Sequence, residues 1–503
     1  MPIRPTHRPP ARLVTHYRRR GGPWDVDTLD GLLTGRHPRS TVLVDGHLRF
    51  RGGALDEWVA EAAGALRVAG VRAGTAVAWH LPNCADAVVL FRACWRLGAI
   101  AVPLHHRFTP AEASNLAGRV GARLLLRAGD LDRLALGEPV PLGASGARPE
   151  KPAVVLFTAG SSGTPKGVIH THRALAHKAR QLPAVHGLSD ADVTLMPAPL
   201  AHVSGLLNGV VLPGALGMGS VLMDHWEPDL AVDLIASEHV SFMVGPPTFF
   251  LGILGARRFA PERVNSLRLV SCGGTGVTPA FVREAGTALR AHVKRTYGST
   301  EAPTIATSQA ADPPEVAALH DGRALGDVEL RISDPATGDE RPVGAEGELW
   351  VRGPELFSGY LDQRRTDDAF SPGGWFRTGD LAAVDGDGWL TITGRLKDII
   401  IRGGENIAAA EVEADLEAHP AVRQAAVVGE PDARLGERAV AYVVVDPGAG
   451  AFDLEVCRRW FAELGVARYK TPERVVTVAE LPLLASGKVD KVALKAGRVG
   501  RVG

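Results

Sequence analysis

The most informative stretch of this 503-residue chain is Thr158-Ala159-Gly160-Ser161-Ser162-Gly163-Thr164-Pro165-Lys166-Gly167, which directly follows an apolar run, Ala153–Phe157. A short apolar run that ends in glycine and hydroxyl residues is typical of a buried strand entering a loop. In such a loop, glycines let backbone N–H groups approach phosphate oxygens, hydroxyls add donors and a lysine adds positive charge. The Walker form is excluded, because it needs four residues between its glycines and a Ser or Thr directly after its lysine. The stretch therefore predicts a phosphate-binding loop of another kind.

Short β-rich runs alternate with helical patterns on both sides of this loop. The expected strands are Ala76–Leu81, Ala99–Leu104, Ala153–Phe157, Phe242–Val244 and Leu267–Ser271, and the expected helices are Ala85–Leu97 and His172–Gln181. Such alternation predicts an α/β fold with mostly parallel sheets flanked by helices. Open parallel sheets bind ligands at the carboxyl ends of their strands, so we expect the site among those loops.

After about residue 345 the chain changes to short strands and tight turns, which predicts a small β-rich part. The tail then predicts a helix near Ala409–Ala418 and strands near Ala425–Gly429 and Ala439–Val445. We expect two domains, a large one over residues 1–394 and a small, mobile α+β domain over residues 395–503.

Composition excludes several partners and compartments. The 56 basic and 56 acidic side chains balance, whereas nucleic acid or an anionic membrane normally calls for a basic excess. The four cysteines form no CxxC pair, which favours a reducing, cytoplasmic location. The uncharged stretch Val203–Met223 is long enough to cross a bilayer. Polar residues and glycines interrupt it, so we expect a buried helix followed by a core strand and no membrane span.

Five segments, taken in order, resemble the motifs of adenylate-forming enzymes, the superfamily of acyl-CoA synthetases, nonribosomal adenylation domains and beetle luciferases. They are the phosphate loop, Tyr297–Glu301, Trp375–Asp380, Gly394–Asp398 and Ser486–Lys491. Each alone has a plain explanation as a turn, a helix cap or a solvated tail. Their order across the chain supports the resemblance, since a motif is confirmed by its context.

The resemblance implies a nucleotide site for ATP and Mg²⁺. The implied nucleotide-binding residues are Thr158, Ser161, Ser162, Gly163, Thr164, Lys166, Gly273, Gly274, Thr275, Tyr297, Gly298, Ser299, Thr300, Asp380, Arg395 and Lys488. Tyr297 would stack on adenine and Asp380 would accept ribose hydroxyls. Glu301 and Thr158 would hold the metal. Lys488 would be the catalytic lysine that bridges the carboxylate and the α-phosphate, and these three residues form the implied catalytic set. The family more often has other residues at Thr275-Gly276, which leaves the pocket shape there open.

The resemblance also implies an acyl pocket bordered by His202, Gly205 and Gly273. An interior histidine bonded to a backbone carbonyl is the alternative reading of His202. No acidic residue lies between His202 and Asp224, and an unpaired ammonium would be expensive to bury there. The uncharged pocket therefore suits an apolar acid, and the segment looks most like that of synthetases for alicyclic, aryl or medium-chain acids. His105-His106 lacks the Asp-Gly of acyltransferase motifs and was given no role.

For the later steps, the resemblance implies a domain hinge at Lys397 and a tunnel for the CoA pantetheine arm at Gly403 and Gly404. The expected activity is that of an acid–CoA ligase: ATP-dependent formation of an acyl adenylate with release of pyrophosphate, then transfer to CoA. Carrier-protein loading, amide formation and activation of nitrite for diazotisation remain alternatives, and a carrier protein and a second copy of the chain remain candidate partners. A non-catalytic binding protein is disfavoured by intact Lys166, Glu301, Asp380 and Lys488.

We expect ATP–pyrophosphate exchange to be faster with a ring-bearing or medium-chain acid than with any amino acid, because the pocket segment supplies no carboxylate for an α-ammonium group. A panel of acids scored by exchange rate measures this preference. A clear preference for a zwitterionic amino acid would contradict it.

Overall fold

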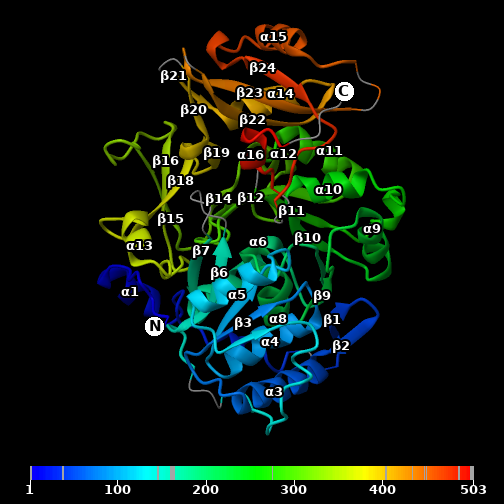
Figure 1. Cartoon of the computed structure of the whole chain (residues 1–503), viewed down its shortest axis with the longest axis vertical. Coiled ribbons are helices and arrows are strands. Elements are labelled where there is room, and N and C mark those ends of the chain that lie inside the picture. Colours follow the sequence, from blue (N-terminus) through cyan, green and yellow to red (C-terminus); the bar gives the residue numbers. More distant parts are fainter. Residues whose placement is uncertain are drawn as a thin grey trace.

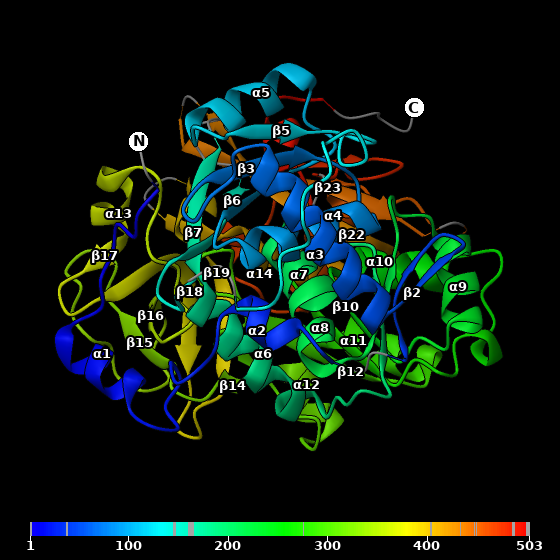
Figure 2. The ribbon, with the colours of Figure 1, turned by 90° about the horizontal axis from the view of Figure 1, so that it is seen from below.

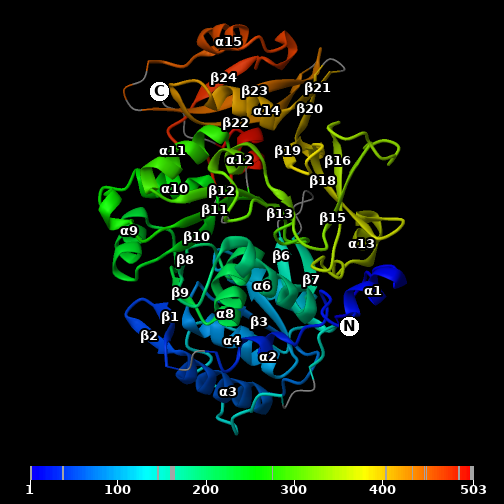
Figure 3. The same ribbon diagram turned by 180° about the vertical axis from the view of Figure 1, so that it is seen from behind.

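The computed structural model describes residues 3–36, 39–143, 147–158, 165–274, 276–402, 405–432, 434–446, 448, 450–484 and 488–498. The strands in these ranges form four sheets. One of them, built from the C-terminal residues, caps the end of a larger body that holds the other three (Figure 1). The same cap is seen from behind in Figure 3.

The largest sheet has nine strands in the described ranges, in the order β14-β13-β12-β11-β10-β8-β9-β1-β2. They are β1 (Thr41–Asp45), β2 (Leu48–Arg51), β8 (Val193–Met196), β9 (Gly219–Leu222), β10 (Phe242–Gly245), β11 (Leu269–Gly273), β12 (His292–Tyr297), β13 (Ala306–Thr307) and β14 (Arg323–Ala324). The central pairs are parallel and the pairs at both edges are antiparallel. Helices α9 (Pro228–Ser237), α10 (Pro247–Leu254) and α11 (Pro279–Leu289) connect successive parallel strands. The predicted α/β class is confirmed.

A second sheet runs in the order β5-β3-β4-β6-β7. Its strands are β3 (Ala76–His80), β4 (Ile100–Leu104), β5 (Leu124–Leu126), β6 (Pro152–Thr158) and β7 (Lys166–Thr171), and its neighbouring helices are α3 (Gly52–Val68), α4 (Ala85–Arg96), α5 (Pro110–Arg119) and α6 (His172–His186). Strands β3 to β6 are parallel, whereas β6 and β7 are antiparallel. Helix α6 continues five residues beyond the expected Gln181, until left-handed Gly187 caps its end.

The uncharged stretch Val203–Met223 folds as we expected. It forms α7 (Val203–Leu206), a π-helical turn (Leu207–Val211) and α8 (Leu212–Leu216), and then enters β9 in the large sheet. Leu206, Val211 and Leu212 belong to the main hydrophobic core. Among the described residues, no helix combines the length and hydropathy that a membrane crossing requires.

The predicted β-rich part is a five-stranded antiparallel sheet. It consists of β15 (Glu329–Ser333), β16 (Gly347–Arg352), β17 (Phe370–Ser371), β18 (Trp375–Val384) and β19 (Leu390–Arg395), with α12 (Pro314–Leu319) before it and α13 (Gln363–Ala369) within it. The chain begins with α1 (Ala11–Arg18) and α2 (Leu29–Leu33). Seen from below, α1 lies beside this sheet, on the opposite side of the molecule from α9 (Figure 2).

The C-terminal sheet is ordered β21-β20-β23-β22, with β24 beside β23. Its elements are β20 (Ile399–Arg402), β21 (Glu405–Ala408), α14 (Ala409–Glu417), β22 (Val422–Asp432), β23 (Gly436–Val445), α15 (Leu454–Glu463), β24 (Arg474–Thr477) and α16 (Lys491–Lys495). The chain passes from the third sheet to this one through a single 3₁₀ turn, Leu396–Asp398. That change of sheet supports our proposed division into residues 1–394 and 395–503.

Three strand predictions were displaced or too short. Strand β11 runs two residues later than the expected Leu267–Ser271, because its parallel register with β10 begins at Leu269. Strands β22 and β23 extend well beyond the expected Ala425–Gly429 and Ala439–Val445. The two form one long hairpin whose ladder includes polar residues that an apolar pattern leaves out.

Candidate active site

Most of the predicted site residues follow the carboxyl ends of strands. Thr158 ends β6, Gly273 ends β11 and Tyr297 ends β12. Because parallel strands end at the same edge of a sheet, β11 and β12 present their loops side by side. The structure thus gathers these predicted residues at the carboxyl edge of the sheet, and their role as a ligand site remains a prediction.

Asp380 is the most tightly held of these residues. It lies on β18, is 2% exposed, and faces Arg395 across the β18–β19 ladder. The Tyr297 hydroxyl donates to Asp380 Oδ2 over 2.6 Å, and Arg395 Nε donates to Oδ1 over 2.5 Å. Burial, and then the neighbouring Asp380, raise the pKa of Tyr297 far above its usual value, so the phenol remains a donor. A carboxylate has about four acceptor positions, and these two donors of the described residues occupy one on each oxygen of Asp380.

Glu301 sits in the loop after β12 and is fixed through both its side chain and its backbone. The Tyr360 hydroxyl donates to Glu301 Oε1 over 2.7 Å, and the Phe357 N–H donates to the Glu301 carbonyl over 2.8 Å. Next to it, the His170 ring contacts the Thr300 carbonyl through Nε2 at 2.7 Å. Among the described residues, the Tyr360 hydroxyl is the hydrogen-bond partner of this side chain, on Oε1. Carboxylate oxygens are hard ligands of the kind that suits Mg²⁺.

The phosphate loop is described at its two ends. Thr158 on β6 and Lys166 on β7 face one another in the antiparallel ladder. The Lys166 ammonium lies over the Tyr360 ring, 5.2 Å from its centroid. Several predicted residues lie outside the described ranges, and their roles stay predictions: Ser161, Ser162, Gly163, Thr164, Thr275, Gly403 and Gly404.

Lys488 comes from the C-terminal region and reaches the loop after β11. A methyl group added at Gly274 would lie 3.4 Å from Lys488 Cε and 3.9 Å from Nζ. Burial, and then Arg395, lower the pKa of Lys488 to about 8, while Asp380 and Glu301 act in the opposite direction. The structure therefore brings this lysine into the electrostatic field of both carboxylates.

Two glycines of the predicted set are explained by close backbone contacts. A Cβ at Gly273 would lie 2.2 Å from the Thr296 carbonyl oxygen, and one at Gly205 would lie 2.1 Å from the Pro199 carbonyl oxygen. Gly298 and Ser299 form the turn after Tyr297, in which Ser299 N–H donates to the Ala302 carbonyl. These contacts explain why glycine stands at 205 and 273, and their pocket roles remain predictions.

His202 lies at the start of α7 with its ring against that of His105. The ring centroids are 5.3 Å apart and the planes are perpendicular. Burial, and then Lys488, lower the pKa of His202 to about 4, so its ring is neutral at pH 7. His105 is also buried, and its Nε2 has no hydrogen-bond partner in the part of the chain that the structure describes.

Sequence reasoning missed two residues of this region. His105 was considered only as part of an unrelated motif, and Tyr360 lies outside all five motif segments. The one signal for them in the sequence is position, since His105 follows β4 and Tyr360 lies in the loop after β16, as many other residues do. Lys397 is exposed and lies in the turn Leu396–Asp398, which connects two sheets; its role as a hinge remains a prediction.

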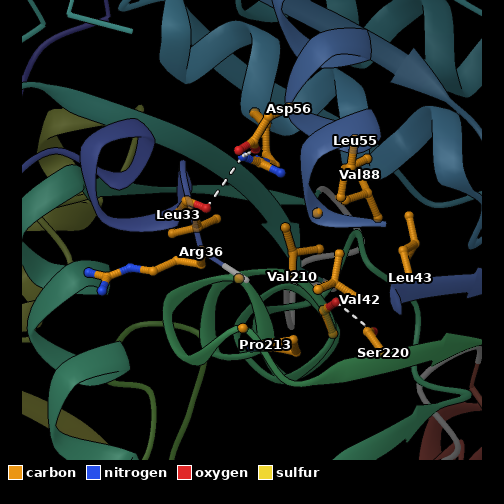
Figure 4. A pocket seen from close by; sticks show the side chains of 15 residues that line it. Leu33, Arg36, Val42, Leu43, Leu55, Asp56, Val88, Val210, Pro213 and Ser220 are labelled. Atoms are coloured by element: carbon orange, nitrogen blue, oxygen red, sulfur yellow. Dashed lines mark hydrogen bonds and ion pairs between the residues drawn. The ribbon is translucent and has the colours of Figure 1, made fainter. Parts of the chain in front are cut away.

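A separate crevice lies between α2, α3, α4 and the π-helical turn (Figure 4). Its lining is mostly apolar, and its Asp56 and Arg92 side chains are joined in an ion pair. The described residues that line it include no predicted site residue, so we place no chemistry there.

Comparison with known proteins identifies related sequences and structures. Residues 34–361 match the family model "AMP-binding enzyme", and residues 411–488 match "AMP-binding enzyme C-terminal domain". A medium-chain fatty-acid–CoA ligase of Escherichia coli K12 is 34% identical over 91% of this chain and 88% of its own length. A feruloyl-CoA synthase of an Amycolatopsis species is 33% identical over 90% and 95%. The crystal structure of ATP-bound MatB from Rhodopseudomonas palustris superposes with a TM-score of 0.85 at 27% identity, covering 94% of this chain and 99% of that one.

The lowered pKa of Lys488 gives a pH prediction. If the charged ammonium assists the step that consumes ATP, formation of enzyme-bound product should fall as pH rises through about 8, where the ammonium loses its proton. Single-turnover rates with saturating ATP between about pH 7 and 10 measure this decrease in rate at alkaline pH. A flat profile over that range in the wild-type enzyme, identical to that of Lys488→Ala, would contradict the assignment.

Proposed function

The chain belongs to the AMP-binding enzyme family, and we propose that it is an AMP-forming acid–CoA ligase. We propose that its acid carries the carboxylate on an uncharged ring or on a medium-length alkyl chain. The predicted superfamily and reaction class are confirmed by the family match and by the acid–CoA ligases among the relatives. The observation that carries our assignment of roles is the approach of Lys488 to Gly274, beside Glu301 and Asp380.

Activation of a carboxylate by ATP needs charged groups in fixed positions and no covalent nucleophile of the protein. A carboxylate is a poor acyl donor because its leaving group would be oxide, and joining it to AMP replaces that group. The acid is already ionised at pH 7, so no general base is needed to start the attack. The protein has to hold both reactants in line and neutralise charge that builds up at the α-phosphate. We assign this task to Lys488, whose ammonium would bridge the carboxylate and the α-phosphate; its approach to Gly274 supports the assignment.

The nucleotide is bound by residues already held in place. Tyr297 offers its ring to adenine, Asp380 accepts from the ribose hydroxyls, and Lys166 and Thr158 contact phosphate oxygens. When bound, Mg²⁺ neutralises phosphate charge, and Glu301 and Thr158 are the residues that would hold it. The free acceptor positions of Asp380 and Glu301 support these roles.

The acid would occupy the pocket bordered by His202. The neutral His202 and His105 rings and the lack of any acidic residue between His202 and Asp224 support an apolar acid, whose only charge is its carboxylate. The relatives named for medium-chain fatty acids and for ferulate support the same class.

The second half-reaction would use a different arrangement of the C-terminal domain. Rotation about Lys397 would withdraw Lys488 and admit the CoA thiol along Gly403 and Gly404. A carrier protein as acceptor and a homodimer remain secondary proposals. A cytoplasmic location is supported by the cysteines, all four of which are free thiols.

Lys488→Ala should lose about 10²–10³-fold in adenylate formation, the usual effect of removing a preorganised charge. It should still convert a synthetic acyl adenylate to the thioester at close to the wild-type rate, because Lys488 is absent from that step. Rapid-quench measurement of each half-reaction decides the matter. Lys495→Ala, an exposed lysine on the same segment, is the matched control. Equal loss in both half-reactions, or loss in neither, would show that Lys488 is not the catalytic lysine.

Lys397→Pro should spare adenylate formation and slow thioester formation, because a proline fixes φ and restricts the preceding residue in a turn that has to change conformation. Lys397→Ala, which keeps the backbone free, should retain both rates. The same two half-reaction assays measure the effect. A folded Lys397→Pro enzyme with both steps slowed equally would contradict the hinge role.

A further inference from the structure

One buried tyrosine links two parts of the nucleotide site that are far apart in sequence. Tyr360 is 4% exposed and lies in the segment after β16. Its hydroxyl donates to Glu301 Oε1 over 2.7 Å, and its ring lies below the Lys166 ammonium, 5.2 Å from Nζ to the centroid. The same side chain thus contacts the carboxylate after β12 and the lysine at the end of the phosphate loop.

Tyr360 is itself fixed through its backbone. Its N–H donates to Thr366 Oγ1 over 2.9 Å, and its carbonyl accepts from Thr6 Oγ1 over 2.9 Å. It also forms an isolated β-bridge with Val168 of β7, and Phe357 packs edge-on against its ring. Because these contacts come from the N-terminal segment, from β7 and from α13, the phenol has little freedom to turn away from Glu301.

The direction of the hydrogen bond follows from its two groups. An ionised carboxylate only accepts hydrogen bonds, so the Tyr360 hydroxyl is the donor and Glu301 Oε1 the acceptor. This bond takes one acceptor position of Oε1 and leaves the rest of the carboxylate for a cation. A hydrogen bond that orients a ligating carboxylate raises metal affinity. The electron-rich face of the ring attracts the Lys166 ammonium.

We propose that Tyr360 is a positioning residue for the first half-reaction, which orients Glu301 toward the magnesium ion of Mg·ATP and Lys166 toward the phosphates. The inference rests on the proposed function, since it concerns the same nucleotide site. It adds a residue from outside the recognised motifs and gives it a role distinct from core packing.

Core packing alone is the competing explanation, because Val168, Phe357 and Phe376 surround the ring in a small hydrophobic cluster. Tyr360→Phe separates the two, since it keeps the ring and the packing and removes only the hydroxyl. Tyr17→Phe is the matched control. Tyr17 is 1% exposed, packs edge-on against Trp24, and its hydroxyl has no hydrogen-bond partner among the residues the structure describes.

The test measures ATP binding by calorimetry at increasing Mg²⁺ concentration. The measured quantity is the Mg²⁺ concentration at which the increase in ATP affinity is half complete. We expect this concentration to be at least about 10-fold higher in Tyr360→Phe, the usual effect of losing a hydrogen bond to a metal ligand. Tyr17→Phe should match the wild type. In Tyr360→Phe, adenylate formation should slow and thioester formation from supplied adenylate should not change.

A double-mutant cycle shows whether Tyr360 acts through Glu301. In a Glu301→Gln background, Tyr360→Phe should bring no further change in Mg²⁺ requirement. An unchanged Mg²⁺ requirement in folded Tyr360→Phe, or a fully additive effect in the cycle, would overturn the proposal. Failure of the wild type itself to bind ATP or to release pyrophosphate would instead overturn the proposed function.

Discussion

A single buried carboxylate, Asp380, connects the parts of the chain that have to meet. It accepts hydrogen bonds from Tyr297 at the end of the nine-stranded sheet and from Arg395 at the exit toward the C-terminal sheet. A buried carboxylate without such partners would be costly, and charge-assisted bonds offset that cost. The arrangement brings two sheets to one point, and the same point lies within the field of Lys488.

Around that point, the residues divide into those that contact substrates and those that hold them. Those proposed to contact the nucleotide are Asp380, Glu301, Lys166 and Lys488. Tyr360 lies behind Glu301 and Lys166 and is fixed by the N-terminal segment. Loss of alignment in these supporting contacts would slow the reaction without removing any group that reacts, because rate depends steeply on the placement of charges.

Sequence patterns predicted what depends on local order. The strands β3, β4 and β6 were found because buried parallel strands are continuous apolar runs between turns. The phosphate loop and the Tyr297–Glu301 segment could be proposed because each is a motif of consecutive residues. The displaced start of β11 came from pairing with β10, which no local pattern contains.

What sequence could not predict are contacts between distant residues. The Tyr360–Glu301 bond joins positions 59 residues apart, and the His105–His202 contact joins two loops after different sheets. Neither Tyr360 nor His105 stands out in its own segment, because a single tyrosine or histidine in a loop has no distinctive spacing. Lys488 was identified by resemblance, while its approach to Gly274 required the packing of the C-terminal cap on the larger body.

The most direct test of an AMP-forming mechanism follows the oxygen atoms of the acid. When the carboxylate attacks the α-phosphate, one of its oxygens stays with AMP after the acyl group is transferred to CoA. With an acid labelled with ¹⁸O in its carboxylate, and with CoA and Mg·ATP, mass spectrometry should find one labelled oxygen in AMP and none in pyrophosphate. Label in orthophosphate together with ADP, or AMP formed without label, would contradict the adenylate route.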